Sequence, residues 1–523
     1  MAAVALALVA QPDAEPFARA DAFASEVKSM LQSPAMDRKT HSEMEEFLSE
    51  KAREWARLML EENLELRARA EERQRVVDSQ GRPRESVRKS LRHLETILGR
   101  VAVPRLAYQS PGTPDLHPMD GALNLPKELY SHGVRRVVAR EAACLSFDEV
   151  VERVKEYTGA KINKRQVEEL AVRAAQDFDA FYEQRTLSNT MTEDLLVIST
   201  DGKGIVMRHE DLREDTKQAA ERSVRKVETR LTPGQKRNRK RQAQVATVYS
   251  VAPHVRRAED LAGGSGSSAP TENTRPCPTD KRVWASVEKD AKVVIREAFD
   301  EAQRRDPEHK RHWVVLVDGD QKQLRAIKDE ANRLQAGVTI IADFVHVLEY
   351  IWVAARALFG ETSAEAEEWV RYHLMGLLSG VSGEETVESI RSWQMRVTPG
   401  ASANAAIDKA CHYLGDAERI PMMRYGHALE LGLPIATGVI EGACRYLVKD
   451  RMDRCGARWS LKGADAVLRL RALRASHDFD EYWQFHLEQE NRRNHTSHYQ
   501  DGTIPTPIPP AKTSSRPHLR RIK

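Results

Sequence analysis

The sequence has few cysteines, no long apolar run and almost no net charge. Its five cysteines are scattered without Cys-x-x-Cys spacing, so neither a zinc site nor a disulfide framework is supported, and a reducing compartment is expected. No apolar run is long enough to span a bilayer. Because the net charge is only +3, affinity for nucleic acid has to come from local basic patches rather than from the whole chain.

The length and composition indicate a helix-rich protein of several domains. A chain of 523 residues is long enough for about two to four domains. The content of 41% hydrophobic and 30% charged residues is typical of a soluble protein. The first ten residues, MAAVALALVA, are apolar but lack a basic n-region and a clear cleavage site, so they do not predict a signal peptide.

Helical patterns dominate the N-terminal part of the chain. Apolar residues at three- and four-residue spacing predict an amphipathic helix within residues 40–75. A second helix is predicted over 86–98, followed by a short strand at 101–103. Residues 104–125 read as a Pro/Gly-rich loop, and 128–185 as several helices.

Within that helical region, SFDEVVERVKEYTG and AKINKRQVEELAVRAAQDF predict a helix, a glycine turn and a second helix. Lys161, Lys164 and Arg165 open the second helix. The pattern is equally typical of a DNA-binding helix-turn-helix and of a plain helical hairpin.

From residue 193 onward the apolar pattern changes to short compact runs. Strands are predicted at 195–200, 244–252, 312–320 and 338–346. A helical face is predicted between the second and third strands, carried by Trp284, Val287, Ala291, Ile295 and Phe299. Residues 347–430 show helical patterns only, so the sequence predicts an α/β core interrupted by a long helical insertion.

Three acids stand out against this pattern. Asp201 and Asp318 each end an apolar run and precede a glycine, and Glu441 lies at the head of a basic helix. Functional side chains of open α/β sheets gather at the carboxyl ends of strands. Alone, each aspartate is more typical of an Asp-Gly turn, and Glu441 of a solvated helix. Together they indicate a site for divalent metal ions, because Mg²⁺ prefers oxygen ligands.

Other candidate residues flank these acids. Asp343 and His346 directly follow the fourth predicted strand, as an auxiliary pair or as a helix cap and a packed histidine. Two basic groups are candidate phosphate contacts, although such runs are more often solvated surface. The first is Lys236, Arg237, Arg239, Lys240 and Arg241; the second is Arg445, Arg451, Arg454 and Arg458.

Four motifs carry a resemblance to a known family. STDGKG (199–204), VDGDQKQL (317–324), DFVH (343–346) and GVIEGACRYLVKDRM (438–452) resemble the DDE transposases of bacterial insertion sequences, particularly the ISKra type and its mutator-like relatives. The segments KRQVEELAVRAAQDFDAFY and GARWSLKGADAVLRLRAL are similar to the same group. The ordered set of motifs is more specific than any one of them.

The resemblance implies an RNase H-like core in which Asp201, Asp318 and Glu441 bind two Mg²⁺ or Mn²⁺ ions. The acids would end the first strand, end the fourth strand and follow the helical insertion, respectively. Implied partners are double-stranded DNA, as element ends and as target, and further copies of this chain on that DNA, in the bacterial cytoplasm. Relatives often carry cysteine pairs around residues 104–120, which this sequence lacks.

The expected fold is therefore α/β: an RNase H-like mixed sheet with a long all-helical insertion, preceded by a helical DNA-binding region. Two alternatives to a transposase remain, an RNase H-fold endonuclease without strand transfer and a non-catalytic DNA-binding protein derived from a transposase. The expected segments are 1–98 (helical), 99–190 (possible helix-turn-helix), 191–346 (core, with a basic insertion at 205–243), 347–436 (helical insertion), 437–485 (core) and 486–523 (basic, disordered tail).

Overall fold

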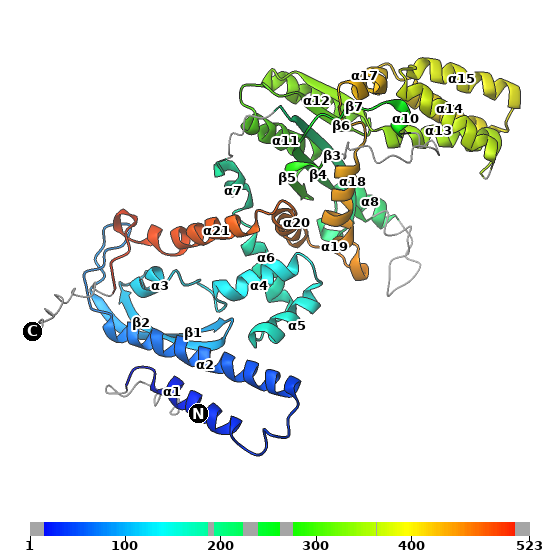
Figure 1. The fold of residues 1–523 in the computed structure, drawn as a ribbon. Coiled ribbons are helices and arrows are strands. Elements are labelled where there is room, and N and C mark those ends of the chain that lie inside the picture. Colours follow the sequence, from blue (N-terminus) through cyan, green and yellow to red (C-terminus); the bar gives the residue numbers. More distant parts are fainter. Residues whose placement is uncertain (1–14, 187–192, 223–238, 262–275, 362, 508–523) are drawn as a thin grey trace, which may run out of the picture. The chain divides into compact units, whose positions relative to one another are not determined.

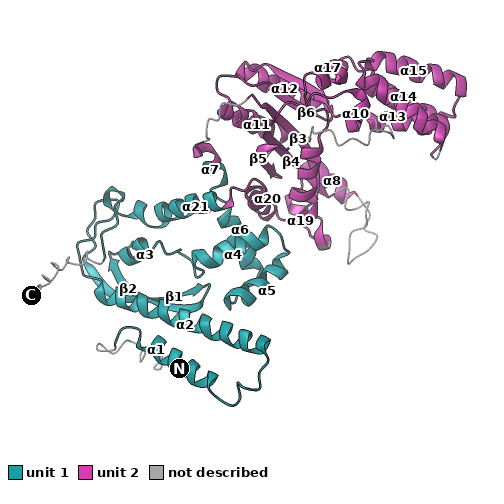
Figure 2. Ribbon diagram, in the orientation of Figure 1, with its two compact units in different colours: residues 1–181, 480–523 teal, residues 182–479 magenta. Residues whose placement is uncertain are grey.

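The computed structural model describes residues 15–186, 193–222, 239–261, 276–361 and 363–507 (Figure 1). The chain forms two compact units (Figure 2): unit 1 comprises residues 1–181 and 480–523, and unit 2 comprises residues 182–479. Among the described helices, none has both the length and the apolar character needed to cross a membrane.

Unit 1 begins with two helices and a β-hairpin. Helix α1 (Ala18–Leu31) precedes the long α2 (His41–Ala70), whose first turn is closed by a capping box between Thr40 and Glu43. Strands β1 (Ser86–Thr96) and β2 (Gly99–Gln109) pair antiparallel, and α2 packs against β2. The predicted amphipathic helix within 40–75 is confirmed.

The helix predicted over 86–98 is wrong, because these residues form β1. Val87, Leu91 and Leu94 keep a helix-like spacing in the sequence, yet Leu94 is paired with Val101 and buried, whereas Leu91 is 58% exposed. Pairing with the apolar neighbouring segment outweighs the local pattern. The loop predicted from residue 104 is also wrong in part, since β2 runs on to Gln109.

The helices of unit 1 include a three-helix group. Helices α4 (His132–Ala142), α5 (Phe147–Thr158) and α6 (Lys164–Ala174) pack on one another. Gly159 ends α5 at φ +71°, and Asn163 begins α6 with a capping box, so the predicted helix, glycine turn and helix are confirmed. The other helices are α3 (Pro118–Ala122), α7 (Phe178–Gln184), which runs into unit 2, and α21 (Phe479–Asn494).

Unit 2 is built on a mixed five-stranded sheet, which confirms the α/β class. Its strands are β3 (Leu195–Val206), β4 (Lys240–Val251), β5 (Thr279–Ser286), β6 (Trp313–Val317) and β7 (Val338–Ala342). The spatial order is β5-β4-β3-β6-β7. The pairs β3/β4 and β4/β5 are antiparallel, whereas β3/β6 and β6/β7 are parallel.

Helices cover both faces of this sheet (Figure 1). Helices α11 (Ala291–Arg305) and α12 (Gln321–Leu334) pack together, and α11 lies against β3 and β4. Across the sheet, α18 (Gly438–Ala443) leads into a π-helical segment (Cys444–Lys449), α19 (Asp450–Met452) and α20 (Leu461–Ala475). Two short helices follow the first two strands: α8 (Glu214–Glu221) comes after β3, and α10 (Ala258–Leu261) comes after β4 and contacts α14.

Between β7 and α18 the chain is helical in its described residues, as the sequence predicts. The helices of this insertion are α13 (Phe344–Phe359), α14 (Ala364–Leu378), α15 (Gly383–Val397), α16 (Ala401–Leu414) and α17 (Tyr425–Glu430). They extend from the sheet toward one end of unit 2 (Figure 1).

Three further predictions are corrected. The strand predicted at 195–200 does not turn at Asp201-Gly202 but continues to Val206, because β4 pairs with it along its whole length. Trp284 lies in β5, a strand the prediction missed, and not on the following helix. The tail predicted to be disordered from residue 486 is helical to Asn494, and its last residues, 508–523, lie outside the described part.

Candidate active site

Strand register brings three aspartates to one edge of the sheet. The parallel pair β3/β6 sets Ser199 opposite Leu316, so the same register continued by two residues sets Asp201 opposite Asp318. In the pair β6/β7, Val317 faces Ala342, which sets Asp318 opposite Asp343. Neighbouring strands lie about 4.8 Å apart. Asp201 lies inside β3, but its parallel partner β6 ends at Val317. Asp201 is therefore at the carboxyl end of the parallel strands, where the sequence predicts it.

Electrostatic coupling also links Asp201, Asp318 and Glu441. Burial raises the pKa of Asp318, the negative charge of Asp201 raises it further, and the Asp320 N–H bond opposes both. The pKa of Glu441 is also raised, first by burial, then by Asp343 and Asp201. Asp201 thus acts on both other acids, as expected for carboxylates that face a common space.

Asp343, directly after β7, is hydrogen-bonded to the residue that precedes α18, the helix that carries Glu441. Its buried carboxylate accepts hydrogen bonds from Val345 N–H (3.2 Å), Thr437 N–H (3.1 Å) and the Thr437 hydroxyl (2.6 Å). Thr437 Oγ1 also lies 3.4 Å from Glu441 Oε1. Asp343 therefore caps α13 and fixes Thr437, the residue before α18. Through Thr437 it is linked to Glu441, which also experiences the charges of Asp343 and Asp201.

His346 lies on the Asp318 side of the site. Its ring is edge-on to Tyr350 and Tyr413, and its Nδ1 is 3.3 Å from Glu349 Oε2. Its influence lowers the pKa of Asp318, against the larger effect of burial. Asp343 and His346, predicted as one auxiliary pair, thus influence different acids: the charge of Asp343 raises the pKa of Glu441, and His346 lowers that of Asp318.

Cys444 is a site residue that the prediction missed. Its buried thiol donates a hydrogen bond to Asp201 Oδ2 (Sγ to Oδ2, 3.1 Å), and burial together with Asp201 raises the pKa of the thiol, which keeps it protonated. Cys444 lies three residues after Glu441, and residues at that spacing share a helix face. This spacing is the signal from which the contact could have been found.

The helix changes from α to π at Cys444, a feature frequent at functional sites. Carbonyl groups in the π-helical segment are bound from outside: the guanidinium of Arg471 donates to Leu447 O (2.7 Å) and to Tyr446 O. Arg471, on α20, thereby supports the segment that aims Cys444 at Asp201.

Two arginines predicted to contact DNA have partners within the chain. Arg451 is 2% exposed and lies over the Trp459 ring, 4.7 Å from its centroid. Arg241 is half-buried and donates to the carbonyl groups of Val287 (2.8 Å) and Asp211 (3.3 Å). Both side chains are thus directed at these partners, and their predicted contact with phosphate stays a prediction. Lys236 and Arg237 lie outside the described residues.

The remaining predicted basic residues are accessible, and some of them meet at one edge of unit 2. Met207, just past β3, donates its N–H to Arg239 O (3.0 Å) and is bridged to Trp459. This brings Arg239 and the exposed Lys240 near the exposed Arg458. Arg445 and Arg454 are exposed on the segment that follows α18.

The acids fit divalent cations in their chemistry. No group of three His, Cys, Asp or Glu side chains in the described part of the chain is arranged as a ready metal cage. Over the same residues, Asp201, Asp318 and Glu441 form no ion pair with a basic side chain. Acids that repel one another without a counter-charge match the oxygen ligands that Mg²⁺ prefers.

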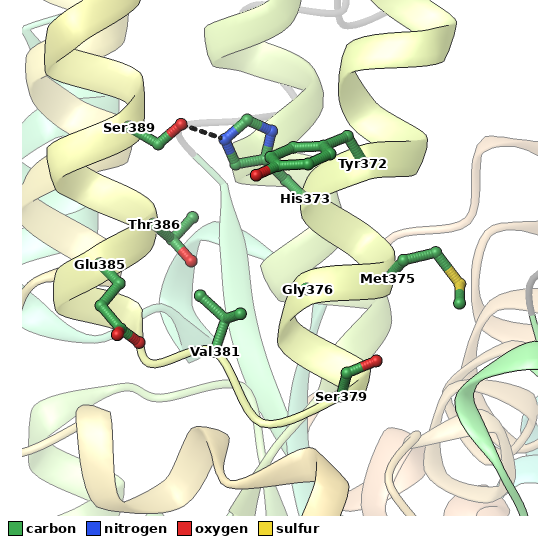
Figure 3. A pocket seen from close by; sticks show the side chains of 9 residues that line it. All are labelled: Tyr372, His373, Met375, Gly376, Ser379, Val381, Glu385, Thr386 and Ser389. Atoms are coloured by element: carbon green, nitrogen blue, oxygen red, sulfur yellow. Dashed lines mark hydrogen bonds between the residues drawn. The ribbon is translucent and has the colours of Figure 1, made fainter.

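Unit 2 also has a hollow of about 370 Å³ between α14 and α15 (Figure 3). Its polar groups are already paired: His373 Nε2 lies 3.0 Å from Ser389 Oγ, and the Glu385 carboxylate accepts a bond from Ser382 N–H (2.8 Å). The hollow contains none of the predicted acids, so we assign no chemistry to it.

The raised pKa of Asp318 has a measurable consequence for stability. Because the folded chain holds this proton more tightly than the unfolded chain, stability is lost as pH rises from the ordinary carboxyl range through the raised pKa of Asp318. Without divalent ions at pH 7, Asp318→Asn is expected to raise the Tm by about 1–2 °C. Scanning calorimetry measures this shift.

Asp320→Asn is the matched control. Asp320 is exposed on the same turn and caps α12, a role that Asn fills equally well, so its Tm should rise less than that of Asp318→Asn, through the loss of its weaker repulsion on Asp318. Mg²⁺ should then stabilise the wild-type chain but not Asp318→Asn. A Tm for Asp318→Asn equal to or below that of the wild type would contradict the like-charge arrangement.

No known family model matches the sequence, and no curated protein matches it. The geometry of the site and the sequence motifs therefore indicate its function.

Proposed function

We propose that this chain is a DNA transposase of the DDE type, in which unit 2 is an RNase H-like catalytic core. Asp201, Asp318 and Glu441 are its catalytic acids. The observation that carries the proposal is the register that sets Asp201 opposite Asp318, together with the Asp343–Thr437 contact that holds Glu441 above the same edge.

The sheet supports this core in a second way. Counted within unit 2, β3 to β7 are strands one to five, in the spatial order 3-2-1-4-5 with parallel pairing only between strands one, four and five. The first acid lies on strand one and the second follows strand four, as the resemblance implies. The third follows the helical insertion.

The chemistry follows from the acids. When bound, two divalent ions would polarise the phosphodiester and lower the pKa of the attacking hydroxyl group. The chain contributes the ligands: Asp201 is central, Asp318 follows the neighbouring strand, and Glu441 approaches from α18. Cys444 orients the Asp201 carboxylate by its hydrogen bond. The same site would serve water in cleavage and a 3′ hydroxyl in joining.

Three basic residues, Arg239, Lys240 and Arg458, form a basic edge that can bind DNA extending from the acids. From Asp201 to Val206 the strand β3 rises about 17 Å, which equals the rise of roughly five base pairs along the axis of a DNA duplex. Arg239, Lys240 and Arg458 lie at that end of β3. A duplex with its scissile phosphate at the acids can therefore be held by these side chains.

Neutralising this edge is expected to weaken DNA binding through charge. The triple variant Arg239→Ala, Lys240→Ala, Arg458→Ala should lower the slope of log Kd against log salt by about 2 to 3, because each lost phosphate contact removes roughly 0.9. Fluorescence anisotropy over a range of salt concentrations measures the slope. Arg371 is an exposed arginine on α14, and Arg371→Ala should leave the slope unchanged. An unchanged slope in the triple variant would show that these three side chains do not bind DNA phosphates.

A strand-transfer assay tests the function itself. The full chain is incubated with Mg²⁺, a target plasmid and duplexes that carry the DNA flanking its gene on each side. A transposase produces free 3′ hydroxyl ends and joins them to the plasmid. Cleavage without joined products would favour the endonuclease, and DNA binding without cleavage in Mg²⁺ or Mn²⁺ would favour the non-catalytic protein.

A further inference from the structure

Two tyrosines of the helical insertion reach back to the ends of β6 and β7. The hydroxyl of Tyr413, on α16, donates to the carbonyl group of Asp318 at 2.7 Å. The hydroxyl of Tyr425, on α17, donates to the carbonyl group of Ala342, the residue before Asp343, at 3.0 Å. Both tyrosines are buried. The insertion thus binds the backbone where the sheet presents its acids.

The Tyr413 side chain is held on both faces. Tyr350 stacks on it at 4.0 Å with an interplanar angle of 10°, and the guanidinium of Arg419 lies 4.6 Å from its ring centroid. Arg419 also donates from Nε to the carbonyl group of Gly319 at 3.0 Å. Two consecutive carbonyl groups, those of Asp318 and Gly319, are therefore bound by neighbouring side chains of one segment.

The contacts of Tyr413 and Arg419 explain why a glycine follows Asp318. Gly319 adopts φ +91°, and a Cβ atom there would lie 2.9 Å from the Tyr413 hydroxyl oxygen and 3.1 Å from Arg419 Nε. A side chain at this position would push both donors away. The Asp-Gly pair therefore serves the approach of Tyr413 and Arg419 as well as the turn.

We propose that the helical insertion is a brace for the second acid, with Tyr413 and Arg419 as positioning residues that set the Asp318 carboxylate relative to Asp201. This inference rests on the proposed function, because the position of Asp318 matters through metal binding. Displacement of a catalytic group by about 1 Å can cost 100-fold in rate. Hydrogen bonds to the backbone beside the acid restrict such displacement without touching substrate.

Tyr413→Phe tests the brace, because it removes the hydroxyl and keeps the stacked ring. In the protein without metal or DNA, amide exchange of a peptide covering residues 317–320 should accelerate about fivefold, the equivalent of one net hydrogen bond. The Mg²⁺ concentration for half-maximal cleavage should rise about three- to tenfold, while the Kd for DNA stays the same.

Tyr350→Phe is the matched control. It removes a hydroxyl from the same stack, and this hydroxyl has no hydrogen bond within the described residues, so neither measurement should change. Arg419→Met removes the second donor and carries the test if Tyr413→Phe does not fold.

The outcomes separate the brace from the proposed function. Exchange and Mg²⁺ dependence like those of the wild type, or faster exchange spread evenly over unit 2, would overturn the positioning role. Exchange is measured without DNA, so faster exchange confined to 317–320 supports the brace even if wild-type protein cuts no DNA. The absence of DNA cleavage by the wild-type protein would instead refute the proposed function.

Discussion

Asp318→Asn is expected to reduce DNA cleavage at least about a thousandfold, while DNA affinity stays the same or rises slightly. The carboxylate follows β6 opposite Asp201 and shares its electrostatic environment. Losing one metal ligand removes several kcal/mol of transition-state stabilisation, and each ~1.4 kcal/mol is a factor of ten in rate. Asn has nearly the same shape, so the fold is retained. Single-turnover cleavage with Mg²⁺ and anisotropy on the same duplex measure both quantities.

The same result is expected for Asp201→Asn and Glu441→Gln. Asp320→Asn controls for the turn, because Asp320 lies two residues from Asp318 but caps α12 with its carboxylate. It should retain cleavage within about twofold, since Asn is an equally good cap. Cleavage above a tenth of the wild-type rate by any of the three amide variants would remove that residue from the catalytic set.

Asp343→Ala is expected to destabilise unit 2 by about 2–4 kcal/mol, although Asp343 has not been assigned a metal. Its carboxylate is 3% exposed and accepts three hydrogen bonds, two of them from Thr437. Removing it leaves buried donors without a partner, and each such donor costs about 1–3 kcal/mol. Urea unfolding, followed by hydrogen exchange in β6 and β7, measures the loss within unit 2.

Asp320→Ala is the control that separates the two roles of Asp343. Each aspartate caps the helix after its strand, but Asp320 is exposed and its carboxylate bonds only to that helix. Asp320→Ala should therefore cost about 1 kcal/mol, the ordinary value of a cap. Equal losses in the two variants would show that the Asp343–Thr437 contact adds nothing.

Much of unit 2 could be predicted from the sequence because its signals are local. The cores of β3, β6 and β7 are compact apolar runs, and helices α13 to α16 show helical spacing. Asp201 and Asp318 are predictable because each ends an apolar run before a glycine, and Glu441 because it lies at the head of a basic helix. Their common edge could not be derived, since it depends on the parallel register between β3 and β6, which is a long-range property.

The errors have physical causes of the same kind. The continuation of β3 past Asp201 depends on β4, whose first residues are charged and gave no strand signal. Arg451 looked like a surface cation, but packing on Trp459 buries it. Long side chains with apolar stems often cover aromatic surface in this way. Charge alone therefore identified only part of the basic surface.

The most direct test of the central claim exchanges one ligand of the site for a softer one. In Asp318→Cys the thiolate suits Mg²⁺ poorly and accepts Mn²⁺ more readily. If Asp318 binds metal, this variant is inactive with Mg²⁺ and recovers cleavage with Mn²⁺, whereas Asp320→Cys cleaves with either ion. Full cleavage by Asp318→Cys in Mg²⁺, or no recovery in Mn²⁺ by a variant shown to be folded, would contradict a metal site at Asp318.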